Sequence, residues 1–113
     1  MADCVFCRIA SGEMEAEVLH SSEKVVAFRD AHPQAPTHIL LVPREHLASL
    51  QGLGNSHADM LSELFQTAAR LAEEEGVDRS GWRMVVNVGS HAGQVVFHLH
   101  FHLMGGRPMG RFA

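Results

Sequence analysis

The segment of residues 95–104, VVFHLHFHLM, constrains the fold of this chain more than any other stretch. Histidines occupy every second position, at His98, His100 and His102, and apolar residues fill the positions between them. Because alternate side chains of a β-strand point to opposite faces of a sheet, the pattern predicts a strand with one apolar face and one imidazole face. The apolar face can pack on a helix, which leaves the histidines available for chemistry.

A helix that can cover such a sheet is predicted between residues 56 and 76. Apolar residues recur there at the helical period and form one stripe: Leu61, Leu64, Phe65, Ala68, Leu71 and Ala72. Further short strands are expected over residues 16–22, 23–30, 38–43 and 82–89. Strands, one long helix and then more strands indicate an α+β fold with a mainly antiparallel sheet.

Length and charge exclude several functional classes. The chain has 113 residues, which fits one domain, and its nine Lys and Arg residues are scattered under a net charge of -4. A nucleic-acid-binding surface is therefore not expected. The apolar runs are far shorter than the roughly 20 residues that span a bilayer, and the N-terminus lacks the pattern of a signal peptide. We expect a cytoplasmic protein without a membrane segment.

The alternate histidines allow three interpretations. They can be ordinary polar residues on a half-exposed strand, although Ser, Thr or Lys would serve equally well there. Two imidazoles spaced by two residues can instead chelate a metal ion. A neutral imidazole can also act as a nucleophile near neutral pH, with its neighbours setting its tautomer and donating protons.

The two cysteines of the chain, Cys4 and Cys7, form a Cys-x-x-Cys pair near the N-terminus. In a cytoplasmic protein this spacing indicates a metal half-site or a redox pair before a structural disulfide. A thioredoxin-like role is disfavoured because no βαβ pattern surrounds the pair.

Three stretches together resemble the histidine triad (HIT) superfamily, in its Hint branch. HLHFHL with the following Met fits the family's triad motif, AFRDAHPQAPTHILLVPREH resembles its nucleotide-binding loop and strand, and WRMVVNVGSHAGQVVFHLHFHLMGGRP resembles its C-terminal signature. The resemblance implies one HIT domain over residues 1–113. It also implies an α+β HIT-like fold, with a mainly antiparallel five-stranded sheet, one long helix and short helices. The family is usually a homodimer that joins two sheets into one.

The resemblance implies that the protein cleaves purine nucleoside 5′-phosphoramidates to a nucleoside monophosphate and an amine. His100 matches the family nucleophile, which forms a nucleotidyl-histidine intermediate that water hydrolyses. His98, His102 and His38 match the other histidines of that site, and one of these imidazoles, if protonated, could neutralise the phosphate. The expected ligands are purine nucleotides such as AMP, GMP and their phosphoramidates. No cofactor is required for the chemistry.

The family's nucleotide-binding positions also have counterparts here. Asp30 matches the acidic residue that accepts hydrogen bonds from the ribose. An apolar purine slot would consist of Val5, Phe6, Ile9, Met14, Phe28 and Ala31. Asn87, Gly93 and Gln94 match the phosphate side, with the Gly93 main chain and the Gln94 amide as donors.

Microbial members of the family bind zinc through the same Cys-x-x-Cys. In this chain the implied ligands are Cys4, Cys7, His46 and His98, which make a closed and therefore structural site. The resemblance therefore implies two roles for His98, one as a catalytic residue and one as a metal ligand.

Two departures from the family pattern affect the leaving group more than the type of reaction. Val95 stands where the eukaryotic pattern has a Ser that can reach the phosphate, and the chain ends PMGRFA instead of in a bulky aromatic tail. Three alternative functions remain: a dinucleoside polyphosphate hydrolase, a nucleotide-binding adaptor with slow turnover, and a zinc-binding module.

Overall fold

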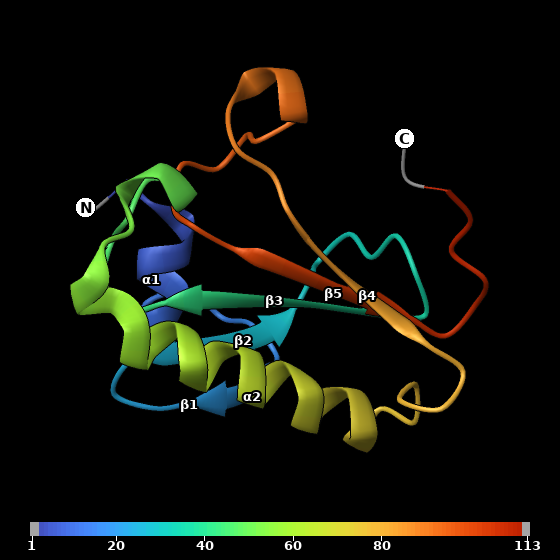
Figure 1. Cartoon of the computed structure of the whole chain (residues 1–113). Helices are drawn as coiled ribbons and strands as arrows, with labels where there is room; N and C mark the ends of the chain where they lie inside the picture. Colours follow the sequence, from blue (N-terminus) through green and yellow to red (C-terminus); the bar gives the residue numbers. More distant parts are fainter. Residues whose placement is uncertain (1–2, 112–113) are drawn as a thin grey trace.

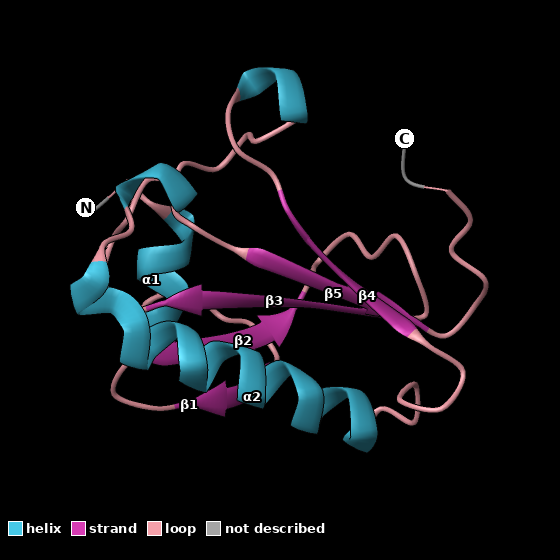
Figure 2. Ribbon diagram, viewed as in Figure 1, coloured by secondary structure: helices cyan, strands magenta, loops and turns pink. Residues whose placement is uncertain are grey.

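An antiparallel sheet of five strands forms the centre of the protein (Figure 1; Figure 2). The computed structural model describes residues 3–111. Across the sheet the strands follow the order β1-β2-β3-β5-β4, and every neighbouring pair is antiparallel. The strands are β1 (Val18–Ser21), β2 (Val25–Arg29), β3 (Thr37–Pro43), β4 (Trp82–Val86) and β5 (Phe101–Gly105).

Two α-helices lie on opposite faces of this sheet (Figure 1). The short helix is α1 (Val5–Ser11), and the long helix is α2 (Ala58–Glu74). Three 3-10 turns complete the elements: Leu50–Gly52, Asn55–His57 and Ser90–Ala92. The predicted fold, an antiparallel five-stranded sheet with one long helix and short helices, is confirmed. Among the described residues, no helix has both the length and the apolar character that crossing a bilayer requires.

Alternation along β2 and β3 divides the interior into two cores. The core on the α2 side is the larger and comprises Val25, Ala27, Ile39, Leu41, Met60, Leu64, Ala68, Leu71, Leu99, Phe101 and Leu103. The core on the α1 side comprises Phe6, Val26, Phe28, Leu40 and Val42. Both faces of the central strands are therefore apolar, which explains the continuous apolar run of β3.

The strand predicted over residues 95–104 was wrong in its first half. Its ladder with β3 includes Phe101, which pairs with Leu41, and does not extend to the residues before it. The main-chain N–H of Leu99 instead donates to the carbonyl oxygen of Leu47 over 2.6 Å. From Leu99 onward the side chains still alternate, because Leu99 packs in the core on the α2 side, whereas Val95 and Phe97 are exposed.

An ion pair joins the C-terminal end of α2 to the end of β2. Both terminal nitrogens of Arg29 donate to the Glu75 carboxylate over 2.8 Å, and the Thr37 hydroxyl is a third donor to that carboxylate. These hydrogen bonds, Arg29 first, lower the pKa of Glu75 below its usual value. The folded protein therefore binds a proton on Glu75 less readily than the unfolded chain does.

We predict that Glu75→Gln destabilises the protein by about 1–2 kcal/mol at neutral pH. The depressed pKa means that this contribution is fully present above the unfolded carboxyl pKa of about 4.3. It should be lost as the pH falls through the lower pKa of the folded state. Urea unfolding of wild type and variant at several pH values measures the difference.

The control is Glu74→Gln, which removes a half-exposed carboxylate paired with Arg70 one turn earlier on α2. Such surface pairs contribute only about 0.3–0.5 kcal/mol. Equal losses in the two variants, or a Glu75→Gln loss that does not change with pH, would contradict the structural role of Glu75.

Candidate functional site

Two histidines of the motif are oriented by main-chain carbonyl groups. His98 Nε2 lies 2.8 Å from the carbonyl oxygen of Pro43, and His100 Nδ1 lies 2.7 Å from the carbonyl oxygen of His98 itself. A carbonyl oxygen can only accept, so each ring donates its proton there. In the neutral rings, His98 Nδ1 and His100 Nε2 are therefore left with lone pairs.

His102 takes the tautomer of His98, opposite to that of His100, because its partner is another histidine. The main-chain N–H of Gln34 donates to His38 Nδ1 over 2.9 Å, which places the proton of neutral His38 on Nε2. His38 Nε2 then donates to His102 Nδ1 over 2.9 Å. The proton of His102 consequently resides on Nε2. Asp30 Oδ2 lies 3.4 Å from the same His38 Nε2.

Burial keeps His38 and His102 neutral. Desolvation lowers the pKa of His38, although the nearby Asp30 charge opposes this effect. Burial, followed by the neighbouring His100 and His38, lowers the pKa of His102 to about 4. Sequence reasoning allowed a protonated imidazole beside the phosphate, but these two rings can offer only neutral N–H donors near pH 7.

A cavity of about 560 Å³ lies between α1 and the sheet, and His100 and His102 form part of its wall. We call it the α1 cavity. The six apolar residues predicted to form a slot all line it: Val5, Phe6, Ile9, Met14, Phe28 and Ala31. The Phe6 ring lies 5.5 Å from the Phe28 ring and 5.0 Å from the His100 ring, measured between centroids. The α1 cavity thus joins an apolar slot to an imidazole with a free lone pair.

Asp30 lines the α1 cavity too, and its Oδ1 accepts the main-chain N–H of His32 over 2.8 Å. Sequence reasoning gave no site role to several other lining residues: Glu15, Ala16, Glu17, Arg29, His32, Leu40 and Val96. Val95, noted as a departure from the family pattern, is also in the wall and is 85% exposed. These residues come from separate segments that meet only in the folded chain, so no local pattern marks them.

The loop that precedes the motif is held together by Gln94. Its buried side chain accepts the main-chain N–H of Gly89, and its Nε2 donates to the carbonyl oxygens of Ala48 and Val96. Both amide hydrogens are therefore engaged within the protein. Asn87, Gly93 and Gln94 are not among the residues that line the α1 cavity. Their predicted contacts with a phosphate stay predictions. The main-chain N–H of Gly93, expected to face a phosphate, donates instead to the carbonyl oxygen of Ser90 over 3.0 Å, and the N–H groups of Gly89, Ala92 and Gln94 also donate within the loop.

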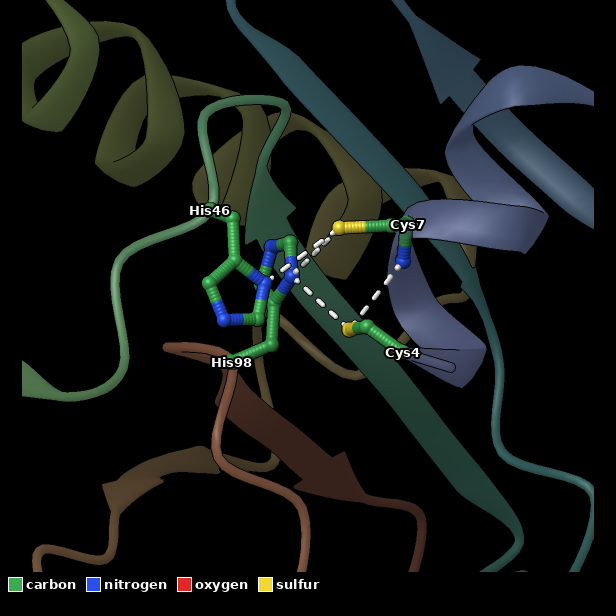
Figure 3. A group of neighbouring side chains, drawn as sticks. All are labelled: Cys4, Cys7, His46 and His98. Atoms are coloured by element: carbon green, nitrogen blue, oxygen red, sulfur yellow. Dashed lines mark hydrogen bonds between the residues drawn. The ribbon is translucent and has the colours of Figure 1, made fainter. Parts of the chain in front are cut away.

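Cys4, Cys7, His46 and His98 converge on one point, as predicted for a metal site (Figure 3). We call this group the cysteine–histidine cluster. His98 Nδ1 lies 3.3 Å from Cys4 Sγ and 3.5 Å from Cys7 Sγ, and His46 Nδ1 lies 3.3 Å from Cys7 Sγ. In a tetrahedral zinc site with usual bond lengths, sulfur and nitrogen ligands are roughly 3.5 Å apart. The spacing therefore fits zinc.

The proton positions fit zinc as well. His98 Nε2 donates to the Pro43 carbonyl, so Nδ1 presents its lone pair to the cluster, which is the usual arrangement for a metal-bound imidazole. Burial and the adjacent Cys4 raise the pKa of the Cys7 thiol. A bound zinc ion would offset that cost by stabilising the Cys7 thiolate.

A second group, Asp30, His38 and His102, is equally close but does not suit a metal. His38 Nδ1 accepts the N–H of Gln34, so Nε2 must carry the proton. A metal at His38 Nε2 would require loss of that proton and an anionic ring. The histidine tautomers therefore suit metal binding in the cysteine–histidine cluster and hydrogen bonding in the group of Asp30, His38 and His102.

An antiparallel five-stranded sheet, one long helix and alternate histidines beside an apolar slot define the class of histidine triad proteins. The HIT domain family model matches residues 11–109, and the chain belongs to this family.

Individual relatives agree with that assignment. The purine nucleoside phosphoramidase of Escherichia coli (strain K12) is 38% identical over 108 residues, which cover 96% of this chain and 91% of the relative. A 14 kDa zinc-binding protein of Brassica juncea is 44% identical, covering 95% and 96% of the two chains. A crystal structure of a HIT family hydrolase from Legionella pneumophila Philadelphia 1 superposes with a TM-score of 0.92 at 43% identity, covering 95% and 96%.

We predict that His102 stays neutral until the pH falls to about 4. In the unfolded chain the same ring takes up a proton near pH 6.5. Since the unfolded state binds more protons between these values, the contribution of His102 to stability is complete above about pH 6.5 and decreases as the pH falls toward 4. Side-chain ¹H–¹⁵N NMR follows the titration and shows which nitrogen carries the proton. A midpoint near 6.5 in the folded protein, or a proton on Nδ1, would contradict this account.

Proposed function

We propose that this HIT family hydrolase cleaves purine nucleoside 5′-phosphoramidates through a covalent nucleotidyl intermediate on His100. One observation carries the proposal: the His98 carbonyl fixes the proton of His100 on Nδ1, so the lone pair of Nε2 is available in the wall of the α1 cavity. A neutral imidazole with a defined lone pair is a competent nucleophile toward phosphorus. The relative from E. coli carries the name of this activity, and the relative from Legionella that of a hydrolase.

In the first step His100 Nε2 attacks the α-phosphorus, and the bond from phosphorus to the amine nitrogen breaks. His100 then carries a positive charge, which its Nδ1–H shares with the His98 carbonyl. The departing amine takes its proton from solvent. In the second step water attacks phosphorus and releases one proton to solvent, the bond to Nε2 breaks, and neutral His100 and a nucleoside monophosphate result.

The remaining residues bind and orient the nucleotide. The Nε2–H of His102 donates to a phosphoryl oxygen, and His38 keeps His102 in the tautomer that makes this possible. The apolar slot around Phe6 and Phe28 takes the purine, and the Asp30 carboxylate accepts the ribose hydroxyls. Val95 has no hydroxyl, so it offers the phosphate no donor in place of the Ser of the eukaryotic pattern.

We also propose a structural zinc ion in the cysteine–histidine cluster. When bound, it supplies a cross-link between the N-terminal segment and the sheet, and it takes no part in the chemistry. The Brassica relative is named a zinc-binding protein. The free thiols of Cys4 and Cys7 suit a reducing compartment, and we place the protein in the cytoplasm.

The chain is further proposed to act as one HIT domain that forms a homodimer. Within the described sheet, β4 pairs on one side with β5, and its five residues are all half-buried. An exposed strand edge of this kind is a template for pairing with another chain. Two copies joined through β4 would form one continuous sheet.

We predict that mixing the protein with an adenosine phosphoramidate gives a transient adenylate adduct, detected by intact-mass spectrometry. His100→Ala should lack the adduct and lose roughly 10³-fold or more in kcat, because the nucleophile is absent. Equal rates of hydrolysis in wild type and variant would rule out the covalent mechanism.

The alternatives separate in the same assay. A large preference for diadenosine polyphosphates over phosphoramidates would identify a dinucleoside polyphosphate hydrolase. AMP binding without turnover would indicate a nucleotide-binding adaptor, and metal binding without AMP binding would leave only a zinc module.

For the metal we predict about one zinc ion per chain in purified protein, measured by elemental analysis. Cys7→Ser should lower that content and reduce thermal stability, because one ligand of the site is removed. Zinc far below one equivalent in wild-type protein with intact thiols would contradict a metal at this position.

A further inference from the structure

The cysteine–histidine cluster joins three segments that are far apart in the chain (Figure 3). Cys4 and Cys7 belong to the start of α1, His46 to the loop after β3, and His98 to the segment before β5. An ion held by all four would tie these segments at one point. Two of the three segments also form walls of the α1 cavity, since α1 supplies its apolar slot and the segment before β5 supplies His100.

The main chain of His98 connects the cluster to the proposed nucleophile. The His98 ring is fully buried, with Nδ1 toward the two thiols and Nε2 on the Pro43 carbonyl. Its own carbonyl oxygen accepts the proton of His100 Nδ1 over 2.7 Å. A ring held at both nitrogens fixes the backbone of its residue, and with it the carbonyl group that orients His100.

Helix α1 provides a second connection. Phe6 lies between the two cysteines in sequence, and its ring packs edge-on against the His100 ring at 5.0 Å and 73°. Seven residues are too few for a helix that is stable on its own, so α1 depends on its anchors. Arg44 anchors the C-terminal end by donating to the Ala10 carbonyl over 2.6 Å. The two cysteines hold the other end.

We propose that His98 is a positioning residue, and that through it and α1 the binding of zinc and the binding of nucleotide strengthen each other. The proposal rests on the proposed function, because it places the nucleotide in the α1 cavity with its phosphate at His100. With the cluster complete, His100 and Phe6 are held in the arrangement that the nucleotide requires. With the cluster empty of metal, the nucleotide has to order both segments on binding, and its affinity falls.

The first test measures AMP affinity by calorimetry on zinc-loaded protein and on the same preparation after removal of zinc with a chelator. We expect AMP to bind the loaded protein more tightly, by a factor in the usual range for coupled sites, roughly 5- to 150-fold. Chelator competition should show that saturating AMP raises the zinc affinity by the same factor, since linkage is reciprocal. Equal AMP affinities in the two forms would overturn the proposal.

A variant test uses His46, which is a cluster member but is not among the residues that line the α1 cavity. His46→Ala should weaken AMP binding at least fivefold. The matched control is His57→Ala, which removes a partly buried histidine bonded to Gly54 and paired with Glu45. This control should leave the AMP affinity within about twofold of wild type. Unchanged AMP affinity in His46→Ala would contradict the coupling.

A third measurement keeps the site loaded, and it decides the matter if the stripped protein or the variant unfolds. Cobalt(II) in place of zinc gives visible absorption bands that report the geometry of its ligands. Saturating AMP should shift these bands, because it acts on His98 through His100. Unmoved bands at saturation would overturn the proposal. If the adenylate adduct still forms in that case, the proposed function stands and only the coupling is wrong. If AMP does not bind the loaded protein, the proposed function itself fails.

Discussion

An imidazole buried away from water needs a partner for its ring nitrogens, and several such rings stand close together in this protein. Among the described residues, no buried side-chain nitrogen or oxygen lacks a hydrogen-bond partner. His98 and His100 meet this requirement with carbonyl oxygens, and His38 meets it with an amide N–H. Each main-chain partner fixes one tautomer, and these tautomers suit the roles proposed for the rings in metal binding, nucleophilic attack and hydrogen-bond donation.

The same burial determines the charge of the site. A cluster of protonated imidazoles would repel itself in a small desolvated space, and the pKa values of His38, His98 and His102 are all lowered. The chain carries a net charge of -4, so no general positive field attracts an anion. A phosphate at this site would be bound by oriented neutral donors, which act at short range and favour a correctly placed group over a merely charged one.

Secondary structure was predicted most accurately for elements in which one hydrophobic period extends over the whole element. The helical stripe that includes Leu64 and Leu71 became α2, and the alternate histidines kept their alternation. The strand over residues 95–104 was predicted too long, because its first half leaves the ladder with β3, and the N–H of Leu99 donates to the distant Leu47 carbonyl instead. The resemblance to the HIT family supplied the grouping of Cys4 and Cys7 with distant histidines, which the spacing of the cysteines alone does not specify.

Other features of the site were beyond any local pattern. Gln94 matches a phosphate-binding position, but its amide is engaged by the carbonyl of Ala48, a contact across 46 positions of the chain. Val96 enters the wall of the α1 cavity only because the loop that precedes it folds back. The tautomers of His38 and His102 likewise follow from the main-chain N–H of Gln34. The Gln34 side chain gives no sign of this contact.

The use of main-chain partners has a consequence for how such a protein can change over generations. The groups that set the three tautomers belong to Gln34, Pro43 and His98, but they are backbone atoms that almost any residue possesses. Substitutions at the first two positions can therefore accumulate while the protons stay where they are. An insertion or deletion in the segments that carry these groups would displace a carbonyl or an amide and alter a tautomer. The chemistry of the site should accordingly tolerate drift in sequence far better than drift in length.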